Sequence, residues 1–151
     1  MINTQTEVGI LNRLATIARD NNALAWFDHG DQEFLFDDQR RVEYPALMVQ
    51  TTGWNFDRTN TTYNFTLYVM DNPVSDTQVD NSDYEWDSNT ATSRDTTAAI
   101  MRDVVGAFAL STAQQDYRVE LLGNTTGFAR GRAQGWRLDL QVITQHELSR
   151  T

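Results

Sequence analysis

The chain has 151 residues, a length that predicts one domain, residues 1–151, with a hydrophobic core of its own. It contains no cysteine, which excludes disulfide bonds, thiolate metal sites and a cysteine nucleophile. The formal net charge is −9, from 12 basic and 21 acidic side chains, and this balance argues against generic binding of nucleic acids or anionic membranes. No apolar run approaches the length of a membrane-spanning helix and no signal peptide is recognisable, so we expect no membrane association.

All the basic residues are arginines, which excludes chemistry that needs a lysine, such as Schiff-base formation. Arginine is a planar cation that forms bidentate ion pairs and is favoured at protein interfaces. A compositional bias of the host accounts for the same fact equally well.

The N-terminal half predicts a helix followed by strands. Apolar residues at helical spacing predict a helix over residues 5–20. One stripe of this helix is formed by Val8, Leu11, Leu14, Ala15 and Ala18, and Ile10 and Ile17 widen it. Residues 23–43 combine a turn at Asp28–Asp31 with a short strand-like run at Phe34–Phe36, and their pattern fits either a hairpin or a long ordered loop.

Two strands are then predicted, over residues 43–54 and 62–70, with a polar hairpin connection between them at Gly53–Thr61. The second has the clearest alternation of the chain. One of its faces is formed by Tyr63, Phe65, Leu67 and Val69.

The C-terminal half begins with a long acidic loop, residues 71–92, and loops of this length are usually functional or mobile. A helix is predicted over residues 93–110, capped by Thr92, Ser93 or Asp95, and Gly106 inside it suggests close packing or simple tolerance. Strands follow near Tyr117–Leu121 and after the turn at 123–127. The last strand begins at Gly135 and directs inward the side chains of Trp136, Leu138, Leu140 and Val142.

This order of elements predicts an α+β fold. Two amphipathic helices and a mainly antiparallel sheet bury their apolar faces best as a two-layer sandwich with both helices on one face of the sheet. The long acidic loop is expected to project from this single domain.

Nothing in the sequence indicates an enzyme. The two histidines, His29 and His146, lie in a polar turn and in the tail, and no nucleophile-elbow motif accompanies them. The acidic run Asp80–Asp83 lacks the glycine and the distal glutamate of a calcium loop. No feature raises the pKa of one carboxyl in a pair, as a glycosidase requires. We therefore predict no catalytic residue, no cofactor and no metal site.

Aromatic and arginine side chains in polar segments are the better candidates, because such residues often anchor protein interfaces. Tyr84 and Trp86 lie inside the acidic loop, and Trp54 lies near the predicted hairpin. Arg130 and Arg132 form a compact basic site that suits a neighbour's carboxylates. The alternatives are that Trp86 folds back onto its own sheet and that the two arginines are simply solvated.

The layout of the chain over residues 5–143 resembles the tail-completion and tail-terminator proteins of tailed bacteriophages, including similar neck proteins. Its features are the N-terminal helix, the strand opening Tyr44–Val49, the alternating strand ending in Asp71, the helix around Ile100–Leu110 and the closing strand Gly135–Leu140.

The resemblance implies a virion protein, assembled in the host cytoplasm, that forms a homo-oligomeric ring, commonly a hexamer. Such a ring caps the tail tube and docks it to the head connector, and DNA passes through the lumen without specific binding. An acidic subunit fits this role because a negative lumen repels the DNA backbone. The acidic side chains that would face the lumen or a neighbouring ring are Asp76, Asp80, Asp83, Glu85 and Asp87.

Three alternatives remain open. The chain could be another virion part, such as a tail-tube, baseplate or connector component. It could be a ligand-binding module in which Trp54 and Trp86 stack on a carbohydrate. Least favoured is a hydrolase that uses carboxylates or a divalent ion.

Overall fold

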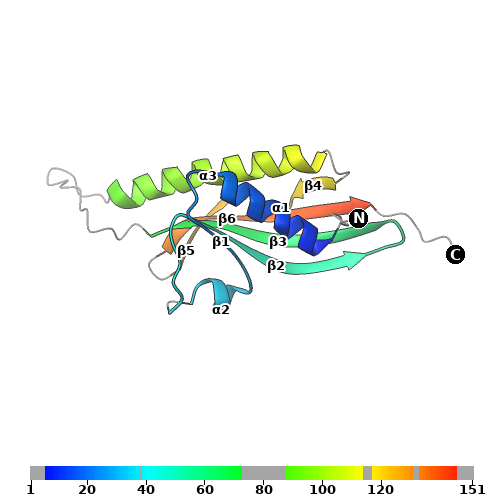
Figure 1. Ribbon diagram of the computed structural model, residues 1–151, viewed down its shortest axis with the longest axis horizontal. Helices are drawn as coiled ribbons and strands as arrows, with labels where there is room; N and C mark the ends of the chain where they lie inside the picture. The colour runs from blue at the N-terminus through cyan, green and yellow to red at the C-terminus, as the bar shows by residue number, and fades with distance from the viewer. Residues whose placement is uncertain (1–5, 38, 73–87, 114–116, 131–132, 146–151) are drawn as a thin grey trace.

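The computed structural model describes residues 6–37, 39–72, 88–113, 117–130 and 133–145 (Figure 1). The described residues form one six-stranded sheet and three helices. The helices are α1 (Glu7–Asp20), α2 (Gln32–Leu35) and α3 (Ser88–Ala113). The strands are β1 (Trp26–His29), β2 (Ala46–Phe56), β3 (Asn60–Asp71), β4 (Tyr117–Leu121), β5 (Thr126–Arg130) and β6 (Ala133–Gln145).

The sheet has the order β1-β2-β3-β6-β4, and β5 pairs with the first part of β6. All strand pairs are antiparallel except β1–β2. The long helices α1 and α3 both cover one face (Figure 1). The predicted two-layer α+β sandwich is confirmed.

The main core lies between the sheet and these two helices. Alternate residues of β3 and β6 point into it, because successive side chains of a strand face opposite sides of the sheet. The predicted inward residues Leu138, Leu140 and Val142 are fully buried there, and Trp136 packs against them. Helix α1 begins where the Thr6 hydroxyl accepts a hydrogen bond from the Gly9 amide, as an N-cap does.

A smaller core lies on the opposite face of the sheet, beneath α2 (Figure 1). It combines strand residues such as Met48 and Tyr68 with Leu35 of α2. Rings from three segments meet here: Phe36 contacts both Tyr68 and Phe128, with ring centroids 5.2 and 5.3 Å apart. The sheet is therefore covered on both faces at this end.

The structure corrects the prediction for residues 23–43. Phe34 and Leu35 belong to helix α2, and Phe36 ends it, because the Asp31 side chain caps the segment by accepting a hydrogen bond from the Phe34 amide. Strand β1 pairs with β2 in parallel, so this region is a crossover connection and not a hairpin.

The second helix is longer than predicted, because α3 begins at Ser88. The three predicted caps, Thr92, Ser93 and Asp95, therefore lie inside the helix instead of capping it. The Ser93 hydroxyl donates to the Asp71 carboxylate, 2.9 Å away, and so attaches the helix to the end of β3. A Cβ on Gly106 would meet no atom within 4 Å, so close packing does not explain this glycine.

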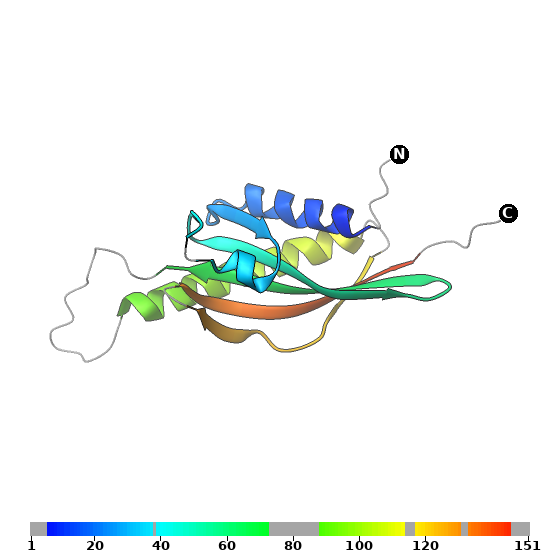
Figure 2. The same cartoon turned by 90° about the horizontal axis from the view of Figure 1, so that it is seen from below.

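Helix α1 buries a narrower stripe than predicted. Ile10, Leu14 and Ala18 are buried, whereas Val8 is 65% exposed. Val8 lies in the first turn of α1, at the end of the helix layer, where the sheet continues without a helix above it (Figure 2).

Candidate subunit interface

The β2–β3 hairpin projects beyond the helix layer (Figure 2). The Thr51 hydroxyl donates to the Glu7 carboxylate in the first turn of α1, at 2.6 Å. The N-terminal end of α1 therefore lies at the level of Thr51 in the sheet. Beyond Thr51 the hairpin continues to a turn in which the Asp57 carboxylate accepts hydrogen bonds from the amides of Thr59 and Asn60. The tip is therefore an ordered turn that extends away from the core.

Two large aromatic side chains, which we call the hairpin pair, lie on this projection. They are Trp54 and Phe56, which are 57% and 71% exposed. Their rings stack with centroids 6.3 Å apart and planes inclined by 23°. Trp54 pairs with Tyr63, which packs against the main core, so the hairpin pair continues the core-facing side of the sheet past the helices.

A register shift in β2 sets this orientation. Thr51 pairs with Phe65 and Gly53 pairs with Asn64, so one extra residue, Thr52, stands in β2. Such a bulge moves the following side chains to the other face. Without the bulge, the Trp54 side chain would lie on the face of the sheet that is opposite to the main core.

The sheet has two open edges at the hairpin end. Strand β1 pairs only with Ala46–Val49, and no described strand pairs with the outer side of Gln50–Phe56. At the opposite edge, the outer side of β4 also has no strand partner among the described residues. The register places both edges at the same end, because β4 pairs with Leu140–Thr144, which pair with Thr61–Phe65.

An apolar groove, which we call the α3 groove, lies between α3 and the sheet near the junction of β4 and β5. Its volume is about 520 Å³. The lining is mostly apolar and contains one charged side chain, Arg102. The groove is lined by Ala98, Met101, Arg102, Val105, Gly106, Leu121, Thr125, Trp136 and Leu138. Leu121 is itself half-exposed, as is its neighbour Leu122.

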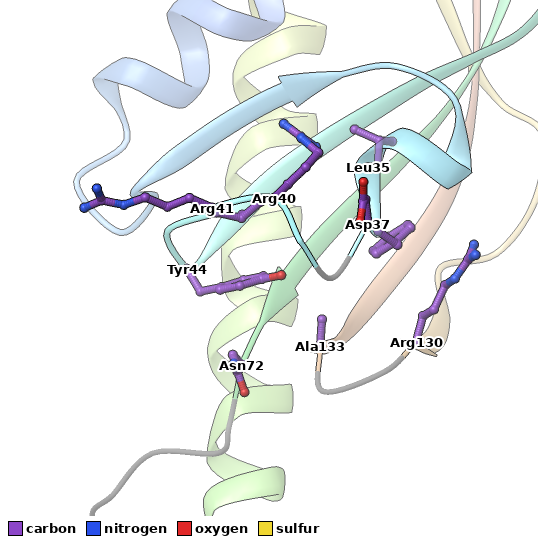
Figure 3. Close-up of a pocket in the computed structure, with 10 residues that line it drawn as sticks. Leu35, Asp37, Arg40, Arg41, Tyr44, Asn72, Arg130 and Ala133 are labelled. Atoms are coloured by element: carbon purple, nitrogen blue, oxygen red, sulfur yellow. The ribbon is translucent and has the colours of Figure 1, made fainter.

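A polar cavity of about 510 Å³ lies on the other face of the sheet, beside α2 and the end of β5 (Figure 3). Arg40, Arg41 and Arg130 line it, but their guanidinium groups do not converge, and that of Arg41 points away from the cavity (Figure 3). The Arg40 guanidinium already has partners, because it forms an ion pair with Asp28 and its Cζ lies 3.7 Å from the centre of the Phe34 ring. The geometry is not that of a multidentate phosphate site.

The Arg40–Asp28 ion pair fixes the crossover connection to β1. The Asp28 carboxylate also accepts a hydrogen bond from the Trp26 indole, 3.1 Å away, and both charged side chains are at most one-fifth exposed. We expect Asp28→Ala to lower the free energy of unfolding by about 1–3 kcal/mol, because two donors then lack an acceptor. Urea denaturation measures this loss. Glu43→Ala is the control, since its exposed ion pair with Arg41 contributes little. Equal losses in the two variants would contradict the assignment.

Of the interface residues predicted from the sequence, the structure describes only Trp54 and Arg130. Trp54 is exposed on the hairpin and Arg130 is exposed at the end of β5, 5.7 Å from the centre of the Phe36 ring. The others lie outside the described residues: Tyr84, Trp86, Arg132, Asp76, Asp80, Asp83, Glu85 and Asp87. Trp54 and Arg130 lie on different strands, and the structure does not bring them into one site.

Sequence reasoning missed Phe56 and the α3 groove. The signal for Phe56 was present, because Trp54 and Phe56 stand two residues apart in a strand and so share a face. The groove had only one local signal, Gly106 in a helix interior.

In the part of the chain that the structure describes, no three side chains of His, Cys, Asp or Glu gather in a metal-binding cluster. His29 is exposed, 3.0 Å from the Thr51 hydroxyl, and His146 lies outside the described residues. Among the described residues, no helix has the length and apolarity to span a membrane.

Comparison with known proteins adds no family to this description. No protein-family model matches the chain, and no curated protein gives a significant match to its sequence.

Proposed function

We propose that the protein is a structural subunit of the head–tail joint of a tailed bacteriophage, in which copies of the chain form a closed ring. The ring would cap the tail tube, dock it to the head connector and let DNA pass through its lumen. This assignment to a virion rests on the resemblance of the sequence layout. The α+β sandwich of the structure is compatible with it.

The observation that carries the assembly part of the proposal is the hairpin end of the sheet. Two open strand edges and an exposed aromatic pair lie together at this end of the described sheet. Unpaired edges and apolar projections favour association with another chain, so single-domain proteins usually protect or cover them. An assembly of many copies would cover both edges at once.

The charge of the chain is consistent with a conduit for DNA. Each copy carries a formal charge of −9, so a ring multiplies a negative potential around its lumen. Such a potential repels phosphates and lets DNA slide without adhering. Non-specific passage therefore needs no basic groove.

We expect the purified protein to form a discrete oligomer whose population rises with concentration. Light scattering at several concentrations measures its mass, and negative-stain imaging then gives its symmetry. The double variant Trp54→Ala/Phe56→Ala is expected to shift the mass toward the monomer, because it removes the apolar projection without touching the core. Phe34→Ala, which removes an exposed aromatic side chain of α2 on the opposite face of the sheet, is the control.

A wild-type protein that stays monomeric at every concentration would contradict ring formation in solution. Open-ended fibres instead of closed rings would favour a tail-tube component, since a heterologous contact that does not close gives a filament.

A second candidate function uses the same aromatic pair. Exposed, nearly parallel rings of Trp54 and Phe56 offer a platform on which a sugar ring stacks. Quenching of Trp fluorescence by members of a glycan panel, lost in Trp54→Ala, would favour a binding module over a ring.

A further inference from the structure

We propose that the hairpin pair of one subunit inserts into the α3 groove of the next copy of the same chain. This inference deepens the proposed function, on which it rests, by naming the contact that joins neighbouring subunits.

The α3 groove is open because side chains are missing on two sides. Gly106 contributes no side chain, and a Cβ there would meet no atom within 4 Å. On the sheet side, β4 pairs with β6 only from Leu140 onward and β5 only up to Arg137, so the edge is interrupted between them. This interruption and the glycine leave apolar floor residues such as Met101 and Leu138 beneath an open space.

The hairpin pair has the chemistry to fill that space. Two stacked aromatic rings present a flat apolar wedge. The groove has a mostly apolar lining and a volume of about 520 Å³. Arg102 on the lining forms no ion pair with any residue that the structure describes. An arginine guanidinium stacks favourably on an indole face, so Trp54 offers Arg102 a cation–π partner.

The neutrality of the contact favours a second copy over an unrelated charged partner. A chain of net charge −9 repels its own copies unless the contact surface itself is uncharged or of opposite charge. The hairpin pair carries no charge and the groove lining carries one positive charge. This combination allows two acidic subunits to approach.

The positions of the two surfaces determine the kind of assembly. The hairpin pair lies on the projecting end of the sheet, whereas the groove lies between α3 and the β4–β5 edge. The groove lining contains no hairpin residue, so the two surfaces do not satisfy each other within one chain. A contact between different patches is heterologous and repeats from copy to copy, which yields a ring when the rotation closes.

The size of the contact predicts its strength. Two aromatic side chains bury about 300–500 Å² in total, compared with about 800 Å² for each partner in a typical stable interface. A single contact of this kind is weak, and a closed ring gains stability because every subunit then makes two contacts. Association is therefore expected to depend steeply on concentration.

Two variants test the contact, because each one disrupts a different surface of it. Trp54→Ala/Phe56→Ala removes the wedge and keeps the groove. Gly106→Leu fills the groove and keeps the wedge, and it is expected to be folded because leucine is a strong helix former, whereas glycine costs about 0.8–1 kcal/mol relative to alanine in a helix interior. Circular dichroism and thermal unfolding check that both variants are folded, and Phe34→Ala, on α2, serves as a control that assembles normally.

We expect the wild type to form oligomers, and each variant alone to remain monomeric at the same concentration. An equimolar mixture of the two variants is expected to form a 1:1 heterodimer and nothing larger, because only one intact wedge and one intact groove remain. This heterodimer has a single weak contact, so the mixture is measured at concentrations well above those at which the wild type assembles. Light scattering distinguishes these masses.

Three results would overturn the inference. Variants that keep the wild-type mass would place the subunit contact elsewhere and leave ring formation standing. Two monomeric variants that do not associate when mixed, even at this higher concentration, would mean that the wedge and the groove do not bind each other. A wild type that is monomeric throughout, with no heterodimer in the mixture, would refute the contact and ring formation in solution together.

Discussion

Replacing Gly135 by alanine is expected to lower the free energy of unfolding by about 3 kcal/mol or more. Gly135 lies in β6 between two partner strands, opposite Met70 of β3 and Phe128 of β5. A Cβ at this position would overlap the carbonyl oxygen of Val69 and approach the Met70 Cα to 3.0 Å. These are backbone atoms of a central strand, so no side-chain rotation relieves the overlap and β3 must separate from β6.

Urea denaturation followed by Trp fluorescence measures the loss, since Trp136 is the next residue. At about 2–4 °C per kcal/mol for a chain of this size, the midpoint of thermal unfolding should fall by about 6–12 °C. Gly127→Ala is the matched control, because Gly127 lies on the adjacent strand β5 and a Cβ there meets no atom within 4 Å. A Gly135→Ala variant as stable as this control would mean that the two central strands are not as close as described.

The elements that the sequence predicts correctly are those in which apolar residues recur at a regular period. Apolar residues alternate from Tyr63 to Val69 in β3 and from Leu138 to Val142 in β6, and each strand lies between two partners with one face against the helices. Burial itself does not alternate in β3, because the second core also covers the other face at Tyr68 and Met70. Helix α1 was found because its apolar residues also recur at a regular period. Its residue Val8 was misplaced, because helical spacing alone cannot reveal where the neighbouring layer ends.

The elements that were missed depend on contacts between distant residues. Helix α2 has one turn, too short for any periodicity, and it is specified by the Asp31 cap and by the burial of Leu35 under the sheet. The start of α3 was placed too late because Thr92, Ser93 and Asp95 were interpreted as candidate caps. The Ser93 hydroxyl instead donates a hydrogen bond to Asp71, 22 residues earlier in the chain.

The candidate interface shows the same division. Trp54 was identifiable as an aromatic residue beside a polar hairpin connection. The exposure of Trp54, however, depends on the position of the N-terminal end of α1 and on the bulge at Thr52. Both are properties of the folded domain. The α3 groove requires α3, β4 and β6 to come together, and Gly106 acquires a structural meaning only once its open surroundings are known.

Two phenylalanines on the same face of the β2–β3 hairpin separate the contributions to stability from those to assembly. Phe65 is 1% exposed within the main core, whereas Phe56 is 71% exposed at the projecting end. We expect Phe65→Ala to lower the free energy of unfolding by about 3–5 kcal/mol, because it leaves a cavity between the sheet and the helices. Phe56→Ala should change that free energy by less than about 0.5 kcal/mol.

Oligomer mass should respond in the opposite way. Phe56→Ala is expected to weaken association while the subunit stays folded, and chemical denaturation and light scattering on the same samples measure both properties. A loss of stability in Phe56→Ala comparable with that of Phe65→Ala would mean that Phe56 belongs to the core of its own subunit. Unchanged stability together with weakened association would mean that the sheet continues past the helices in order to reach another chain.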